Sequence, residues 1–172
     1  MPRVIDFRSA GQFSTIRINN CGSSVGRAVY PKLYSIENLF RIMIHSILTA
    51  QIGAAWWQTA VNQRIQNKVI GYQNTYSRRP WHTNPGRHEI YYTDLGDLLE
   101  IAQTNAHLLA VVVTDINQWV VKIESVRLPR NVAAHMNFLN SQDRKRIDVL
   151  HTDLNTLLDS LRANPLLTLQ IP

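Results

Sequence analysis

The sequence predicts an all-α protein, an antiparallel helical bundle of four to five main helices that carries an irregular N-terminal arm. From residue 34 onward, apolar residues recur at spacings of three and four, which is the period of an amphipathic helix. The same region has no strong strand pattern, in which apolar and polar residues would alternate. Amphipathic helices without strands bury their apolar faces against one another, as in a helical bundle.

Composition divides the chain into three parts. Its 172 residues have the length of one domain with a substantial core. Residues 1–33 hold three glycines and a short alternation at 14–18, which predict an irregular arm with room for a short strand pair. Residues 34–164 are expected to form the helical domain, and residues 165–172 a C-terminal tail.

Start and stop signals predict the order of the helices. Ser35 is a suitable N-cap, Gly53 marks a break, and Pro80 and Pro85 interrupt any helix that reaches them. The expected elements are a helix from Ser35 to Gly53, a helix over 56–69, a loop over 71–91, a short helix over 94–103 capped by Thr93, a longer segment over 109–123 and a final helix over 142–161.

Composition also excludes several classes of protein. Apolar residues make up 45% of the chain, so it is not expected to be disordered, and no apolar run approaches the roughly 20 residues of a membrane span. The N-terminus lacks the apolar block of a secretory signal. Cys21 is the single cysteine, which fits a reducing, cytoplasmic location. Without metal-ligand spacing or a Gly-rich phosphate loop, neither a metal nor a cofactor is expected.

Charge favours a polyanionic partner. The formal net charge is +6, and 14 of the 18 basic residues are arginine. Arginine binds phosphate well because its planar guanidinium donates two parallel hydrogen bonds. An ordinary solvated basic surface explains the charge equally well.

The predicted loop over 71–91 mixes basic and aromatic side chains. Such a mixture suits an RNA strand, because cations meet phosphates and rings stack on bases. The favoured alternative is a polar loop whose aromatic residues are anchored in the core. The residues concerned are Arg78, Arg79, His82, Arg87 and His88 among Tyr72, Tyr76 and Trp81.

The segment 128–135 carries the clearest candidate chemistry. Pro129 suits the first turn of a helix, which would place Arg130 and Asn131 in that turn. A helix start offers free backbone N–H groups and a partial positive charge, to which an arginine adds a full charge. His135 follows about a turn and a half later. It reaches the same site if the helix start is bent or if two chains dimerise.

These residue types suit cleavage of RNA without a metal. The ribose 2′-hydroxyl attacks the adjacent phosphate, and the 5′-oxygen leaves. His135 can move the protons because the histidine pKa lies near neutrality, and Arg130 can stabilise the charge that develops on the phosphorane oxygens. Asn131 can orient the histidine or a phosphate oxygen. DNA, which has no 2′-hydroxyl, is not a substrate for this mechanism.

The spacing of Arg130 and His135 is not specific by itself. Arg146 and His151 repeat it within the last predicted helix. Five residues on a regular helix lie about 140° apart, so that second pair diverges and is interpreted as a solvated arginine and a histidine beside the core. The first pair is distinguished by its proline, its neighbouring asparagine and two small alanines that leave room for a partner.

The motif and its surroundings resemble HEPN domains (higher eukaryotes and prokaryotes nucleotide-binding). Arg130-Asn131-Val132-Ala133-Ala134-His135 resembles the Arg-x4–6-His signature of that family, although Met136 stands where glycine or another small residue is frequent. Residues 36–57 and 92–101 resemble helices of the branch that includes the terminal domain of a nuclear mRNA-surveillance endonuclease and its bacterial relatives. The similarity covers about residues 34 to 161.

The resemblance implies a homodimer that brings two motifs together, with metal-independent ribonuclease activity. It also implies a role as a toxin or defence effector, with a possible cognate antitoxin. Arg130 and His135 would be the catalytic pair and Asn131 their helper. Glu37 and Arg41 match recurrent polar positions, although an i,i+4 surface pair is the favoured interpretation. RNA binding is expected of Arg41, Arg78, Arg79, Arg87 and Arg127. The alternative is a catalytically inactive HEPN module that binds RNA or a partner protein.

Overall fold

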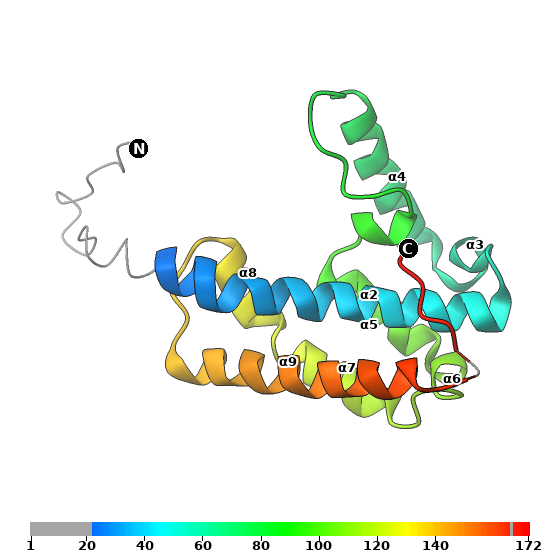
Figure 1. Cartoon of the computed structure of the whole chain (residues 1–172). Helices are drawn as coiled ribbons and strands as arrows, with labels where there is room; N and C mark the ends of the chain where they lie inside the picture. Colours follow the sequence, from blue (N-terminus) through cyan, green and yellow to red (C-terminus); the bar gives the residue numbers. More distant parts are fainter. Residues whose placement is uncertain (1–21, 166) are drawn as a thin grey trace.

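The computed structural model describes residues 22–165 and 167–172, which form helices and connecting turns with no strand among them. The predicted all-α helical bundle is confirmed (Figure 1). The short strand expected at 14–18 and the cysteine at position 21 lie outside the described residues.

The central element is α2 (Tyr30–Ile52), which carries Pro31 in its first turn. The π-helical turn η2 (Ser24–Val29) leads directly into it. The helix predicted to start at Ser35 therefore starts earlier, and the irregular arm predicted over 1–33 is wrong for its described part. The physical reason is burial, because three residues on one face, Val25, Val29 and Leu33, extend the apolar stripe of α2 into the core.

The final predicted helix is confirmed as α9 (Ser141–Arg162), which packs along α2. Arg144 bonds to Ser24, and Asp148 accepts a hydrogen bond from Lys32, so the start of α9 lies beside the start of α2 and its preceding turn. The two helices therefore run parallel (Figure 1). The antiparallel order predicted for the bundle does not hold for this pair. Two helices, α7 (Ile116–Glu124) and α8 (Arg127–Ala134), carry the chain back to the end where η2 lies, and α9 starts there.

The helix predicted over 56–69 is two helices, α3 (Trp56–Ala60) and α4 (Gln63–Ser77). Gly53 breaks the chain before them with a φ of 104°, as predicted. Asn62 separates them, because its side chain accepts a hydrogen bond from the backbone N–H of Ile65 (3.0 Å) and caps α4. α4 runs through Gly71, where the loop was predicted to begin, since one glycine costs a helix only about 1 kcal/mol.

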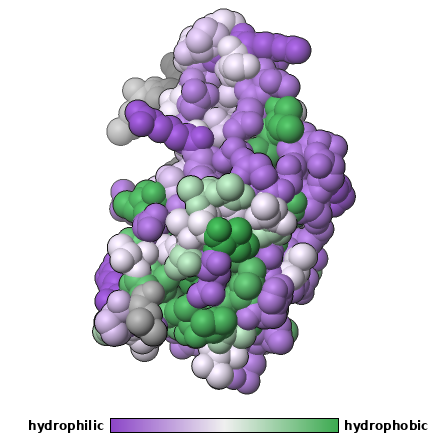
Figure 2. Space-filling model, turned by 90° about the vertical axis from the view of Figure 1, so that its right-hand side faces the viewer, coloured by the Kyte–Doolittle hydropathy of each residue, from purple (hydrophilic) through white to green (hydrophobic). Residues whose placement is uncertain are grey.

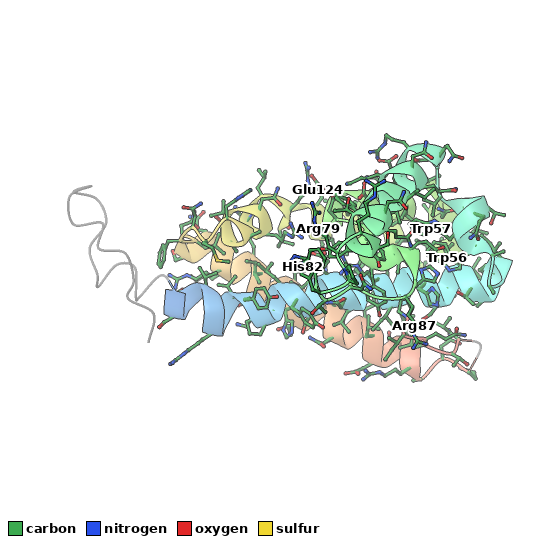
Figure 3. The ribbon with its side chains drawn as sticks, turned by 90° about the horizontal axis from the view of Figure 1, so that it is seen from above. Trp56, Trp57, Arg79, His82, Arg87 and Glu124 are labelled. Atoms are coloured by element: carbon green, nitrogen blue, oxygen red, sulfur yellow. The ribbon has the colours of Figure 1, made fainter. Side chains whose placement is uncertain are left out.

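The second half of α4 and the loop after it project from the bundle (Figure 1). Seen from above, this loop extends over α2 (Figure 3). The chain returns to the bundle through the 3₁₀ turn η3 (Glu89–Tyr92).

The remaining helices differ from prediction only in detail. α5 (Leu95–Thr104) is capped by Asp94 rather than Thr93, in a capping box with Asp97. The segment predicted over 109–123 divides into α6 (Ala106–Leu109) and α7. Four residues of its predicted apolar face, Leu109, Ile116, Val120 and Ile123, are nevertheless buried, so the pattern predicted burial rather than one continuous helix.

The C-terminal tail packs against α2. The hydroxyl of Ser46 accepts a hydrogen bond from the backbone N–H of Gln170 (2.8 Å), and Leu167 is buried. At the end of the molecule where α2 and the tail meet, apolar residues gather on the surface (Figure 2). None of the described helices combines the length and apolar character needed to cross a bilayer.

Candidate functional site

The predicted motif lies on α8, but this helix starts two residues before the predicted proline. Arg127 is its first residue, Pro129 its third and Arg130 its fourth. The backbone N–H of Arg130 donates to the carbonyl of Val126 (2.8 Å), so it is not available to an anion. The expectation that Arg130 and Asn131 lie in the first turn is therefore wrong. Any phosphate contact by Arg130 has to come from its side chain.

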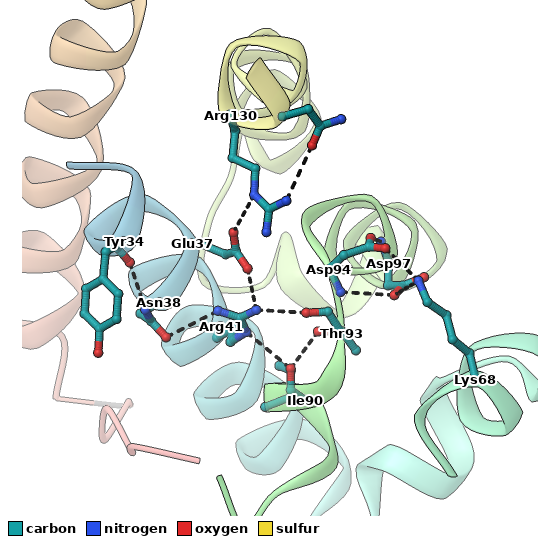
Figure 4. Close-up of polar contacts among 11 residues, drawn as sticks. Tyr34, Glu37, Asn38, Arg41, Lys68, Ile90, Thr93, Asp94, Asp97 and Arg130 are labelled. Atoms are coloured by element: carbon teal, nitrogen blue, oxygen red, sulfur yellow. Dashed lines mark hydrogen bonds and ion pairs between the residues drawn. The ribbon is translucent and has the colours of Figure 1, made fainter. Parts of the chain in front are cut away.

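A carboxylate from α2 orients that side chain (Figure 4). Nε of Arg130 donates to Glu37 Oε2 (3.2 Å), and Nη1 donates to Asn131 Oδ1 (3.4 Å). The Arg130 side chain is still 30% exposed. Nη2 has no hydrogen-bond partner among the described residues. The guanidinium is thus fixed on one side and open on the other.

Arg41, predicted to bind RNA, belongs to the interior of the fold. It is 7% exposed, and Glu37 Oε1 accepts a hydrogen bond from its Nη2 (2.5 Å). The expected Glu37–Arg41 pair therefore forms, but it is buried rather than on the surface. The guanidinium also donates to the carbonyls of Ile90 (3.2 Å) and Thr93 (2.9 Å) and to the side chain of Asn38 (3.3 Å). Arg41 braces α2 against η3, and its donors are not available to RNA.

Two cavities adjoin Arg130. The smaller, of about 130 Å³, lies between α8 and the start of α5, and Arg127 and Asn131 line it too. Arg127 also forms an exposed ion pair with Glu124 (2.7 Å). The larger, of about 320 Å³, lies between α2 and α8 and is lined by Tyr30, Leu33, Tyr34, Glu37, Asn38, Arg41, Pro85, Tyr91, Arg130, Ala133 and Ala134. Of the predicted residues, the structure therefore brings Arg127, Arg130 and Asn131 together at the smaller cavity and Arg41 and Arg130 at the larger one.

The smaller cavity also holds an acidic group, Asp94. Burial works to raise the pKa of this carboxyl, but hydrogen bonds from Lys68 and from the backbone of Asp97 and Gly96 outweigh burial and hold it below its ordinary value. Asp94 is therefore ionised at neutral pH and pairs with Lys68 (2.6 Å).

α8 ends at His135 in a Schellman turn. The backbone N–H of Asn137 donates to Val132 (3.0 Å), and that of Met136 donates to Ala133 (2.9 Å). Met136 has a φ of 59°, in the left-handed region that favours glycine. This backbone explains why a glycine suits the position after the motif histidine. Here a methionine adopts it, at a cost of about 1 kcal/mol.

Arg130 and His135 do not meet within one chain. α8 is continuous as far as Ala134, so the two positions lie about 140° apart around its axis. His135 is exposed and lines neither of the two cavities that Arg130 lines. Of the two arrangements that would join the pair, the bent helix start is not found in α8.

Apolar side chains surround His135 on the outside of α8. Leu128 and Val132 lie one helical turn apart and are 69% and 37% exposed, and Met136 is 81% exposed. We call Leu128, Val132, His135 and Met136 the outer face of α8. Contiguous apolar exposure of this kind marks interaction sites more often than isolated exposed residues do.

The second Arg-x4-His pair has the structural role predicted for it. Arg146 is exposed and pairs with Asp143 (2.8 Å). His151 is half-buried and contacts the amide of Asn155 (3.2 Å). These two residues therefore serve as internal controls for the motif on α8.

The other predicted RNA-binding arginines lie away from the motif. Arg78 and Arg79 follow the end of α4, and Arg87 lies further along the loop (Figure 3). Tyr76 packs edge-to-face on Tyr92 at 5.9 Å, as expected of an aromatic anchor. Trp81 is instead 75% exposed, as expected of a surface that stacks on a ligand.

A buried aromatic cluster supports the base of the loop. His45 Nδ1 accepts a hydrogen bond from Trp56 Nε1 (3.2 Å), and the ring of His88 stacks on Trp56 at 5.3 Å. Burial, reinforced by the charge of His88, lowers the pKa of His45 to about 4. Burial also lowers the pKa of His88, against the opposing effect of Glu89. Both rings are thus neutral at pH 7, and His45 is a buried histidine whose Nδ1 is satisfied by the Trp56 hydrogen bond.

Sequence reasoning missed the contact between Glu37 and Arg130, which lie far apart in the chain. One signal was available, because Glu37 is the single acidic residue between Asp6 and Glu89. A single carboxylate in such a long stretch is available to more than one cation, and Glu37 pairs with both Arg41 and Arg130.

No protein-family model, curated protein or solved structure matches this chain.

Proposed function

We propose that the chain is a HEPN-type, metal-independent endoribonuclease whose active site forms between two copies. The observation that carries the proposal is the division of the motif over α8, with Arg130 at the cavities and His135 on the apolar outer face. Two-fold pairing of these faces would bury Leu128, Val132 and Met136. The proposed site also requires the open side of Arg130 in one copy to lie within reach of His135 of the other, at the edge of this interface.

Each residue then has a role that its surroundings support. The open side of the Arg130 guanidinium would hold a phosphate oxygen, while Glu37 fixes its orientation. Asn131 bonds to the same guanidinium and would position it or the phosphate. His135 would transfer protons to and from the attacking and leaving oxygens. The 2′-hydroxyl is the nucleophile, so RNA and not DNA is the expected substrate.

One observation favours the alternative, a catalytically silent module that binds RNA or a partner protein. Glu37 already compensates the charge of Arg130. Part of the role of Arg130 is therefore structural. The experiment has to distinguish this structural role from a catalytic one.

The experiment is a cleavage assay on total RNA in EDTA with wild type, Arg130→Ala and His135→Ala. Arg146→Ala and His151→Ala are matched controls, since they change the same residue types at the same spacing. We expect cleavage by wild type and by both controls, and a loss of at least about 100-fold in the two motif variants, the usual contribution of a positioned acid–base group. A His135→Ala variant as active as wild type would refute the proposal. RNA binding without any product would favour the silent module.

A toxin or defence effector of this kind would act in the cytoplasm and would be held inactive by a cognate antitoxin. Such an activity makes the wild-type chain harmful to the cell that expresses it. We expect poor growth on expression of wild type and normal growth on expression of His135→Ala. Equal growth with both chains would refute the toxin role, although the chain could still be a nuclease.

A further inference from the structure

The second half of α4 and the loop after it form a protrusion, which we call the α4 tip (residues 72–83). Its base is fixed to α5, because Lys68 bonds to Asp94 (2.6 Å) and to Asp97 (2.7 Å). Ile65 and Val69, the buried residues of α4, both lie in the part of the helix before the tip. The base of the α4 tip is therefore held against the bundle, while no residue of the tip itself is fully buried.

The positive charge of the α4 tip is uncompensated. The sequence has no acidic residue between Glu37 and Glu89. At the base of α4, Arg64 pairs with Glu100 and Lys68 with Asp94 and Asp97. In contrast, no ion pair engages Arg78 or Arg79 among the described residues. The unbalanced charge is thus concentrated where α4 ends.

Exposed aromatic rings accompany this charge. Trp81 is 75% exposed and Tyr72 is 46% exposed. Arg79 lines two hollows, one shared with Arg78 and Trp81 and one of about 670 Å³ shared with Tyr72 and His82. Arg79 and His82 are labelled on this loop in Figure 3. Each hollow therefore combines an aromatic ring with a guanidinium, as a nucleotide with its base and phosphate requires.

The loop connects the tip to the cavity that Arg130 lines. Thr83 lines the larger hollow of the tip, and Pro85 lines the 320 Å³ cavity, with only Asn84 between them in the chain. A strand that docks on the tip has a short path along this loop towards Arg130.

We propose that the α4 tip is a docking platform for single-stranded nucleic acid, with bases stacked on Trp81 and Tyr72 and phosphates on Arg78 and Arg79. Rings stack on bases that are not already stacked in a duplex, so a single strand fits better than a double helix. An acidic peptide would satisfy the arginines but would leave the rings without a stacking partner. The docking goes beyond the proposed cleavage and does not depend on it, since the tip has no feature that requires a 2′-hydroxyl.

The test measures binding of the full chain to a fluorescent single-stranded DNA of about 12 nucleotides by anisotropy. DNA separates docking from the proposed cleavage, because it cannot be cut through a 2′-hydroxyl. We expect Trp81→Ala to weaken binding about fivefold or more and Trp81→Phe to retain most of it. Arg79→Ala should weaken binding and lower the slope of log affinity against log salt by about one.

Arg162→Ala is the matched control, because Arg162 is exposed at the far end of α9 and its loss changes the net charge equally. It should bind like wild type, and a duplex of the same sequence should bind several-fold more weakly than the single strand. The exposed position of Trp81 keeps its variants folded, which thermal unfolding verifies. The proposal is overturned if Trp81→Ala binds as tightly as wild type, if the duplex binds equally well, or if Arg162→Ala and Arg79→Ala lose the same affinity.

Discussion

Replacing Glu37 by Gln tests the network that links the fold to the site. The change keeps the shape of the side chain and removes the charge that Arg41 and Arg130 share. A hydrogen bond to a charged group contributes about 1.5–3 kcal/mol. The bond to Arg41 contributes almost this full amount to stability, because the Arg41 side chain is only 8% exposed. The bond to Arg130 contributes less, because the Arg130 side chain is 30% exposed and water can replace the bond. Arg41 retains the carbonyls of Ile90 and Thr93.

We therefore expect Glu37→Gln to lower the free energy of unfolding by about 2–3 kcal/mol. With a denaturant slope of about 2 kcal/mol per molar urea, the midpoint of urea unfolding should fall by about 1 M. Glu124→Gln is the control, since its pair with Arg127 is about half exposed on both sides and should contribute less than about 0.5 kcal/mol. Equal urea midpoints for the two variants would refute the reasoning.

Three further predictions concern stability, each read from urea unfolding. Because the folded-state pKa of His45 is about 4 and the unfolded value about 6.5, the unfolded chain binds more protons between these values. Stability should therefore fall by about 2 kcal/mol from pH 7 to pH 5; a fall that persists undiminished in His45→Gln would contradict the assignment. Met136→Gly should stabilise the chain by about 0.5–1 kcal/mol by relieving the left-handed backbone, and a destabilised variant would contradict it. Asn62→Ala should cost about 1 kcal/mol through the lost cap of α4, and no change would contradict the capping role.

The sequence predicted burial well and helix boundaries less well. The stripe of α9 was correctly predicted because its apolar spacing is uninterrupted from Ile147 to Leu161. The start of α2 was missed because Gly22 and Gly26 suggested an irregular segment. Local preferences of this size, about 1 kcal/mol, are outweighed when Val25 and Val29 become buried.

The candidate site was predictable only for residues that are close together in the sequence. Arg127, Arg130 and Asn131 share one helix and one cavity, so their proximity follows from the chain itself. The position of Arg41 was not predictable, because its partners Ile90 and Thr93 lie 49 and 52 residues further along the chain.

Mixing two inactive variants tests the shared site most directly. Arg130→Ala and His135→Ala are unfolded together, refolded as an equal mixture and assayed on RNA in EDTA beside wild type. If Arg130 of one copy acts with His135 of the other, half of the dimers are mixed and each has one intact site, so about a quarter of wild-type activity should return. If the mixture remains as inactive as either variant while wild type cleaves, the two residues do not act across a dimer, and the central claim is contradicted.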